Sequence, residues 1–458
     1  MKRLIALSLL LAFSVDAAPL PNTVKQELEK AHIPVESVGI EVREAGKSIP
    51  LISHRAKQGM NPASTMKLLT TYAGLEILKP AYRWKTEVYL DGKLDKGVLH
   101  GNLVFKGYGD PKLTIEEFWL WLRELRQRGL REITGDIVLD RRFFAVDNQG
   151  TAAFDNKPAR AYNVEADALL LNFNALHLRL IPDGAQAIAL LEPELAGFQV
   201  INRVTTSTAL PCKGEDAYQT RIEGRNIVIE GSIPFGCGEA QDYSSPLTPD
   251  SYFSAVFGAL WREVGGQLQG RVRTGSVPNA ANVFSTHFSP PLSEVIRDIN
   301  KFSNNVMARQ LFLTIGAADL ATTAQSTVAI RQWLAAAQMN FPELVLENGA
   351  GLSRTERISA QHLADILQRA ANSPFAAELE ASLPILGMDG TAKGRFKDGG
   401  IAAHFKTGSL EGVKSIAGYV HAKNGKKWIM VFIINHPNAK TGRAAQDALI
   451  EWINKLNQ

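Results

Sequence analysis

The periodicity of apolar residues changes twice along this chain, and the change limits the folds open to it. Residues 18–82 and 250–458 carry helix-forming runs, whereas residues 83–249 consist of short apolar segments separated by Gly, Asp and Pro. Segments of that kind predict strands joined by turns. The sequence therefore predicts an α+β unit, built from both ends of the chain, that is split by a β-rich insertion of one or two subdomains.

The last part of the chain predicts an antiparallel sheet covered by a helix. Three alternating runs, 404–410, 414–421 and 427–435, are joined by short links that contain glycine. Links this short make the strands a meander. We expect the apolar stripe of the terminal helix to pack on this meander, with loose association with a membrane surface as the alternative. The stripe consists of Ala445, Leu449, Trp452 and Leu456.

The first 17 residues have the pattern of an export signal. Lys2 and Arg3 precede an apolar run, and Ala17 occupies a small-residue cleavage position. The run is too short to span a bilayer comfortably, so we expect cleavage and a periplasmic protein without a transmembrane anchor. In an oxidising compartment Cys212 and Cys237 are expected to form a disulfide, and two unpaired thiols are the alternative.

Composition excludes several classes of function. Apolar residues make up 45% of the chain and charged residues 21%, which excludes a disordered protein. The net charge of +4 is small for a protein that binds nucleic acid, so we expect no such partner. Two cysteines exclude cysteine-rich zinc sites, and none of the nine histidines has metal-ligand spacing, so we expect no metal.

Ser64 and Lys67 form the first group of residues suited to catalysis. They lie in the run Pro62-Ala-Ser-Thr-Met-Lys, which opens a predicted helix ending near Leu78. A separation of three residues places both side chains on one helix face. A lysine with a lowered pKa can take the proton of a serine hydroxyl, and a helix N-terminus favours negative charge beside it. A capping serine followed by a solvated lysine would give the same pattern.

Two further polar segments follow later in the chain. Ser303 and Asn305 lie in a predicted junction between two helices, where a hydroxyl and an amide can point the same way; an ordinary N-cap is the alternative. Lys406, Thr407, Gly408 and Ser409 lie within the first meander strand. Alternation places Lys406 and Gly408 on one side and the two hydroxyls on the other. A cation and two hydroxyls favour a carboxylate site, although a solvated strand would also contain them.

Taken together, these three segments resemble the motifs of penicillin-binding proteins and serine β-lactamases. Two further features make the chain similar to the low-molecular-mass class C enzymes. One is the wide interval between Lys67 and Ser303. The other is a set of three segments: Gly107-Tyr-Gly-Asp-Pro, Glu347-Asn-Gly-Ala-Gly-Leu-Ser-Arg and Leu383-Pro-Ile-Leu-Gly-Met-Asp-Gly-Thr. That group is the D-Ala-D-Ala carboxypeptidase/endopeptidase family. The resemblance implies a transpeptidase-like domain, an antiparallel sheet flanked by helices, around the insertion.

The resemblance also implies a role for each residue. Ser64 would be acylated, with Lys67 as general base, Ser303 as proton relay, Asn305 as a ligand of the substrate amide and Lys406 as electrostatic support. Thr407, Gly408 and Ser409 would surround the terminal carboxylate, and Arg354 and Asp155 would contact the third residue of the stem peptide. The substrates would be peptidoglycan stem peptides and cross-links, β-lactams would inhibit, and no cofactor is needed. A β-lactamase and a non-catalytic β-lactam or cell-wall sensor are the alternatives.

Overall fold

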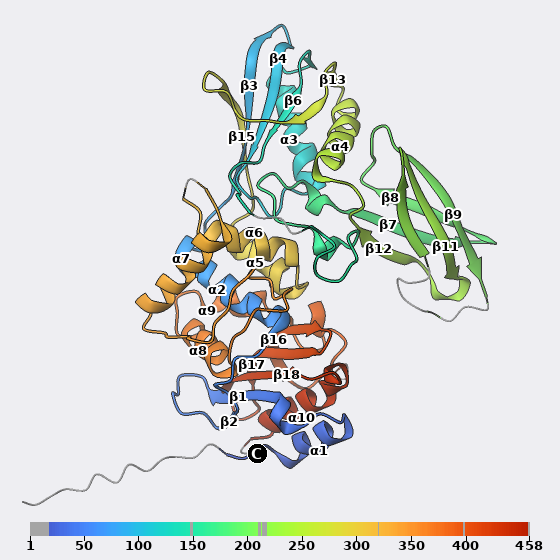
Figure 1. Ribbon diagram of the computed structural model, residues 1–458. Helices are drawn as coiled ribbons and strands as arrows, with labels where there is room; N and C mark the ends of the chain where they lie inside the picture. Colours follow the sequence, from blue (N-terminus) through green and yellow to red (C-terminus); the bar gives the residue numbers. More distant parts are fainter. Residues whose placement is uncertain are drawn as a thin grey trace, which may run out of the picture.

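The computed structural model describes residues 18–146, 150–208, 212, 218–318, 320–396 and 399–456. The expected export signal, residues 1–17, lies outside them. No helix in these described ranges is both long enough and apolar enough to cross a bilayer. Figure 1 shows two parts: a first part, a sheet flanked by helices, to which both ends of the described chain belong, and a second part built around two further sheets.

A five-stranded antiparallel sheet organises the first part, in the order β16-β17-β18-β1-β2. Its strands are β1 (Val38–Glu44), β2 (Ile52–His54), β16 (Ala402–Leu410), β17 (Val413–His421) and β18 (Lys427–Asn435). The last three pair in chain order, so the predicted meander is confirmed. Strand β1 pairs with the free edge of β18 through Ile40 and Phe432, which means that the two ends of the chain complete one sheet.

Helices cover both faces of this sheet (Figure 1). On one face lie α1 (Asn22–Lys30) and α10 (Arg443–Asn454), whose apolar stripe packs against the meander. The other face is covered by a larger group of helices: α2 (Lys67–Leu78), α5 (Leu292–Lys301), α6 (Asn305–Ile315), α7 (Thr323–Ala336), α8 (Ala360–Ala371) and α9 (Ala376–Ser382). Alternation along β17 places Ile416 in the first cluster and Tyr419 in the second, as a sheet buried on both faces requires.

The second part contains a seven-stranded sheet with two helices on it. The path β13-β5-β4-β3-β15 is extended by β6 and β14, which pair beside β4. Its elements are β3 (Lys85–Asp95), β4 (Val98–Gly107), α3 (Ile115–Gln127), β5 (Glu132–Ile133), β6 (Ile137–Asp140), α4 (Pro249–Glu263), β13 (Gln267–Leu268), β14 (Val272–Thr274) and β15 (Asn282–Phe288). Aromatic side chains form the centre of its core, where Phe105 meets Phe118 and Phe257.

A six-stranded sheet in the order β10-β11-β9-β8-β7-β12 completes the second part. Its strands are β7 (Leu176–Asp183), β8 (Gln186–Glu192), β9 (Gln199–Ser207), β10 (Tyr218–Glu223), β11 (Asn226–Pro234) and β12 (Ala240–Ser244). Cys212 and Cys237 are joined by a disulfide. Along β8, Ala187 is buried whereas Ile188 and Leu190 are exposed, so the two faces of this sheet are not equally covered.

The insertion leaves and re-enters the first part at neighbouring points. Lys85 of β3 pairs with Phe288 of β15, and the backbone N–H of Trp84 donates to Ser289 Oγ at 3.0 Å. Helix α4 packs in the aromatic core of the second part. The sequence predicts that the chain returns to the first part at residue 250, because the helical run near Ala255 resembles those that follow it. The packing instead favours a division near residues 84 and 289.

Candidate active site

Ser64 lies in the short 3-10 helix η2 (Ala63–Met66), which leads directly into α2. The backbone of Ala63 has a φ of +45°, a conformation that side-chain-bearing residues rarely adopt. Lys67 is the first residue of α2, and its Nζ lies 3.1 Å from Ser64 Oγ. Leu68, Leu69 and neighbouring residues of α2 are fully buried in the core. Packing therefore fixes the helix that holds the serine and the lysine together.

Lys67 is a buried amine with three acceptors. Its Nζ donates to Ser64 Oγ, to Asn305 Oδ1 at 2.7 Å and to the backbone carbonyl of Ala350. Burial holds the pKa of Lys67 well below its ordinary value, and the charge of Lys406 lowers it further. A neutral amine beside a serine hydroxyl can accept the hydroxyl proton.

Ser303 and Asn305 lie where α5 gives way to α6. Asn304 provides the N-cap of α6, since its Oδ1 accepts from the backbone N–H of Met307 at 3.0 Å. The side chains of Ser303 and Asn305 are therefore not needed for capping. Ser303 has a φ of +58°, which is strained for a serine and turns the chain sharply between the helices.

Lys406 lies in β16 and donates from Nζ to Ser303 Oγ at 2.9 Å. Lys406 Nζ donates a second hydrogen bond, of 2.7 Å, to the backbone carbonyl of Thr407. Burial lowers the pKa of Lys406 to about 7. Lys406 and Gly408 are buried while Ser409 is exposed, in agreement with the expected alternation. The Thr407 hydroxyl donates to Thr391 Oγ1 at 2.6 Å.

Two glycines allow backbone segments to approach the serine. A Cβ on Gly408 would lie 2.9 Å from the backbone nitrogen of Ser64 and 2.8 Å from Pro62 O. A Cβ on Gly351, where φ is +75°, would lie 1.9 Å from Ala63 O. Glycine is therefore required at both positions by the close packing around Ser64.

Glu356 is a buried residue that sequence analysis missed. Its carboxylate accepts four backbone N–H groups of the loop 347–351, at 2.8 to 3.1 Å. That loop carries both the Ala350 carbonyl, which accepts from Lys67, and Gly351. Burial raises the pKa of Glu356, whereas the N–H donors favour the ionised form. The only sequence signal was that this glutamate follows a glycine-containing segment singled out by family resemblance.

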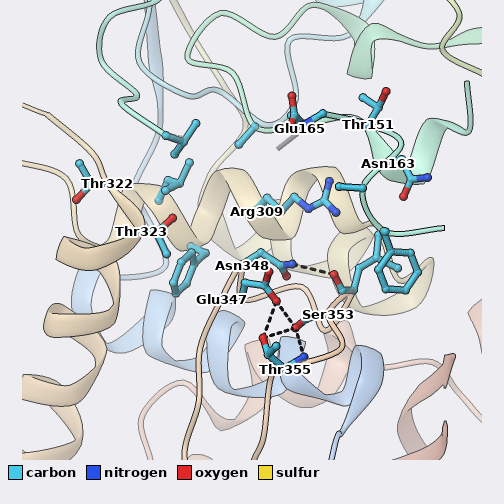
Figure 2. A pocket seen from close by; sticks show the side chains of 18 of the residues that line it. Thr151, Asn163, Glu165, Arg309, Thr322, Thr323, Glu347, Asn348, Ser353 and Thr355 are labelled. Carbon is cyan, nitrogen blue, oxygen red and sulfur yellow. Dashed lines mark hydrogen bonds between the residues drawn. The ribbon is translucent and has the colours of Figure 1, made fainter. Parts of the chain in front are cut away.

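A cavity of about 760 Å³ adjoins these groups (Figure 2). In Figure 2 the Arg309 side chain lies between Glu165 on one side and Glu347 and Asn348 on the other. The described residues that line the cavity do not include Ser64 or Lys67. Asn348 belongs to the loop held by Glu356, and Arg309 lies one turn of α6 beyond Asn305, so the cavity lies next to the hydrogen-bonded group of Lys67 and Asn305.

Arg354 and Asp155 occupy different positions relative to this cavity. Arg354 lines it, with its guanidinium 4.8 Å from the ring centre of Phe154 and a 3.3 Å ion pair to Glu411. The Asp155 carboxylate is not part of the described lining and accepts from Tyr162 Oη at 2.7 Å and Asn163 Nδ2 at 2.8 Å. Asn163 does line the cavity. Arg354 therefore lines the cavity, whereas Asp155 is in contact with Asn163, a lining residue, and does not line the cavity itself.

Comparison with known proteins gives one consistent result. Residues 20–456 match the model of the D-Ala-D-Ala carboxypeptidase 3 (S13) family. The D-alanyl-D-alanine carboxypeptidase DacB of Haemophilus influenzae is 25% identical over 445 residues, covering 93% of this chain and 91% of that protein.

Solved structures show the same fold. Penicillin-binding protein 4 of Haemophilus influenzae matches with a TM-score of 0.74 and 24% identity, over 94% of this chain and all of that one. The same protein in complex with a novel β-lactam matches with a TM-score of 0.72 and 22% identity, over 94% of this chain and 99% of that one. The expected penicillin-binding-protein fold, an antiparallel sheet flanked by helices, is confirmed.

Proposed function

The chain belongs to the D-Ala-D-Ala carboxypeptidase 3 (S13) family, and on that premise we propose that its acyl-enzyme forms on Ser64. It is a serine-type D-Ala-D-Ala carboxypeptidase that acts on peptidoglycan stem peptides. The observation that carries the assignment of the nucleophile is the Lys67 amine, fully buried, 3.1 Å from Ser64 Oγ. Among the described serines, Ser64 and Ser303 each accept a hydrogen bond from a buried lysine amine with a lowered pKa. Ser64 also lies at the start of α2, where the helix N-terminus favours developing negative charge.

Acylation begins with proton transfer from Ser64 to Lys67. The serine oxygen attacks the carbonyl between the two terminal D-alanines, and the developing oxyanion faces the backbone N–H groups of Ser64 and Ser409. The close approach of the Gly408 backbone to the Ser64 nitrogen supports this pairing of strand and helix start. Asn305 holds the substrate amide and, through its Oδ1, the Lys67 ammonium formed in this step.

Departure of the terminal D-alanine needs a proton at its nitrogen. Ser303 supplies that proton, and Lys406 restores it through the 2.9 Å contact with Ser303 Oγ. A pKa of about 7 suits Lys406 to exchanging a proton near neutral pH. Lys67 then releases the proton it took from Ser64 to solvent, and Lys406 regains one from solvent. Water hydrolyses the ester on Ser64, with the neutral Lys67 accepting a proton from the water and returning it to the Ser64 oxygen.

The substrate carboxylate binds beside β16. The hydroxyls of Thr407 and Ser409 face the more open side of the strand, and the buried charge of Lys406 attracts the carboxylate from the other. The rest of the stem peptide extends into the cavity, which offers Arg309 and Arg354 for carboxylates and Glu165 and Glu347 for amines. Arg354 contacts the third stem residue directly, whereas Asp155 acts by orienting Asn163.

The cavity of about 760 Å³, which lies next to the loop that contacts Lys67, has room for the second stem of a cross-link, so the enzyme is an endopeptidase as well. β-Lactams acylate Ser64 because they imitate the D-Ala-D-Ala end. The protein is exported by residues 1–17 and works in the periplasm.

Incubation with a fluorescent penicillin and with a D-Ala-D-Ala peptide tests the proposal. We expect stoichiometric labelling that decays slowly, release of D-alanine, and loss of both in Ser64→Ala with its fold intact by circular dichroism. Rapid turnover of penicillin would indicate a β-lactamase instead, and labelling without D-alanine release would indicate a sensor. Labelling that persists in Ser64→Ala would refute the nucleophile.

A further inference from the structure

We propose that Glu380, His404 and His421 form a binding site for a divalent transition-metal ion such as zinc. One donor atom from each side chain lies within 4.8 Å of the others. Glu380 belongs to α9, His404 to β16 and His421 to the end of β17, near the outer edge of the five-stranded sheet (Figure 1). The three residues are far apart in sequence without regular spacing, which is why sequence analysis predicted no metal.

Strand pairing fixes the two histidines relative to each other. Ala402 pairs with His421 and His404 pairs with Tyr419, so the histidines are diagonal neighbours on one face of the sheet. Their ring centres lie 6.0 Å apart. The segment after α9 bonds to β16, since the N–H of Phe405 donates to Pro384 O at 2.9 Å. Both strands and the helix that supplies Glu380 are therefore tied together before any ion binds.

The hydrogen bonds at the cluster leave one ligand atom without a partner. His421 Nε2 lies 2.5 Å from Glu380 Oε1, whereas His404 Nδ1 is buried and has no hydrogen-bond partner among the described residues. A buried nitrogen of this kind is destabilising unless it meets an ion or water.

The donor set matches the preference of zinc. Two imidazoles and one carboxylate, with a solvent molecule in the fourth position, form a common open zinc site. The His421 side chain is 43% exposed, so an ion reaches the cluster from solvent.

Lys427 is the competing cation at this site. Its Nζ pairs with Glu380 Oε2, the second oxygen of the carboxylate. The ion takes Oε1 and displaces the His421 hydrogen bond, and the proton of His421 Nε2 passes to Nδ1 or to solvent. Because the carboxylate is shared with Lys427, the affinity is lower than in a site with an undivided carboxylate.

Titration of the full-length mature protein without a polyhistidine tag, after dialysis against a chelator, tests this proposal. Calorimetry with ZnCl2 is expected to give one site that is lost in His404→Ala and in His421→Ala. Cobalt should give the visible absorption bands of a tetrahedral site, and zinc should slow amide hydrogen exchange in Ala376–Ser382. Penicillin labelling is unchanged in His421→Ala, which shows that the variant folds.

His362→Ala is the matched control. His362 Nδ1 lies 2.6 Å from Glu343 Oε1, so this pair resembles His421 and Glu380 but lacks a third ligand. Zinc binding should be intact in this variant. Absence of zinc binding in the parent protein, or equal binding in the parent and in both cluster variants, would overturn the proposal. Either result leaves the acylation of Ser64 unaffected, so this test is independent of the proposed function.

Discussion

The five-stranded and six-stranded sheets differ in how many faces are covered, and chemistry follows that difference. In β18 every residue from Trp428 to Ile434 is buried, while in β8 exposed residues alternate with residues that are buried or half-buried. The first pattern places helices on both sides of a strand, so a side chain such as Lys406 is removed from water. The exposed side of the second sheet cannot desolvate a cation. The comparison teaches that the lowered pKa of the Lys406 amine depends on a sheet that is covered on both faces.

The largest effect is expected from Lys67→Met, which keeps the volume of the side chain and removes the base. Acylation by penicillin should fall about 10³-fold, the usual contribution of a general base. Stopped-flow fluorescence measures the rate constant. Met66→Leu is the neighbouring control, since its side chain is buried in the core and carries no group that can act as a base. A loss of less than tenfold in the acylation rate of Lys67→Met would show that this buried amine is not the general base.

The pH dependence of stability tests the burial of Lys406 directly. Its pKa is about 7 in the folded protein and about 10.4 in an unfolded chain, so the unfolded state binds more protons between these values. The free energy of unfolding should therefore rise by a few kcal/mol from pH 7 to pH 10 in the parent protein. Lys406→Met should lack this part of the rise in urea titrations. Parallel curves for the two proteins would contradict the lowered pKa.

Gly351→Ala tests the close approach to the serine. The added Cβ would overlap Ala63 O and displace Ser64, so acylation should fall about 10²-fold. Gly425→Ala is a matched control, because Gly425 also has a positive φ but its Cβ meets nothing within 4 Å. Both variants carry similar backbone strain, of about 1–2 kcal/mol, because alanine rarely adopts a positive φ. Equal acylation rates in the two variants would show that Gly351 is needed only for its backbone conformation and not for the close packing beside Ser64.

Glu356→Gln should have a smaller effect, about tenfold on acylation, because it leaves the loop 347–351 with fewer acceptors. Glu343→Gln is the control: Glu343 also accepts a backbone N–H, from Ser359 at 2.9 Å, but it does not contact that loop. Both substitutions should lower the melting temperature, and only the first should slow acylation. Equal slowing in both would assign Glu356 a purely structural role.

The smallest effect on acylation is expected from the double change Cys212→Ser and Cys237→Ser. The disulfide closes a 25-residue separation in the part that contains the six-stranded sheet, and removing it should destabilise that part by about 3 kcal/mol. The acylation rate should stay within about twofold of the parent rate, since no catalytic group is displaced. A large loss of acylation would show that the two sheets are not independent.

The sequence was most informative where a local pattern determines the outcome. The meander, the helix after Ser64 and the alternation of Lys406 and Gly408 follow from periodicity and were found as predicted. The family motifs brought Ser303 and Asn305 to attention, and in the structure Asn305 accepts from Lys67 while Ser303 accepts from Lys406.

Features that depend on long-range packing were missed. Glu356 acts on a loop through backbone N–H groups, which leave no trace in the pattern of side chains. The sequence predicts a boundary at residue 250, whereas the aromatic partners of α4 favour one near residue 289. Helix α4 is amphipathic like the helices of the other part, so periodicity alone does not show where it packs. His404 and His421 meet through strand register, which a spacing rule for metal ligands does not detect.

The antiparallel pairing of Lys85 with Phe288 has a consequence for the ancestry of such chains. Because the insertion starts and finishes at adjacent backbone positions, the surrounding polypeptide follows the same path with or without it. A single recombination event at this point can add, remove or exchange about 200 residues while the serine, both lysines and the meander keep their positions. Modules that vary freely between enzymes with one conserved chemistry are expected at such a junction.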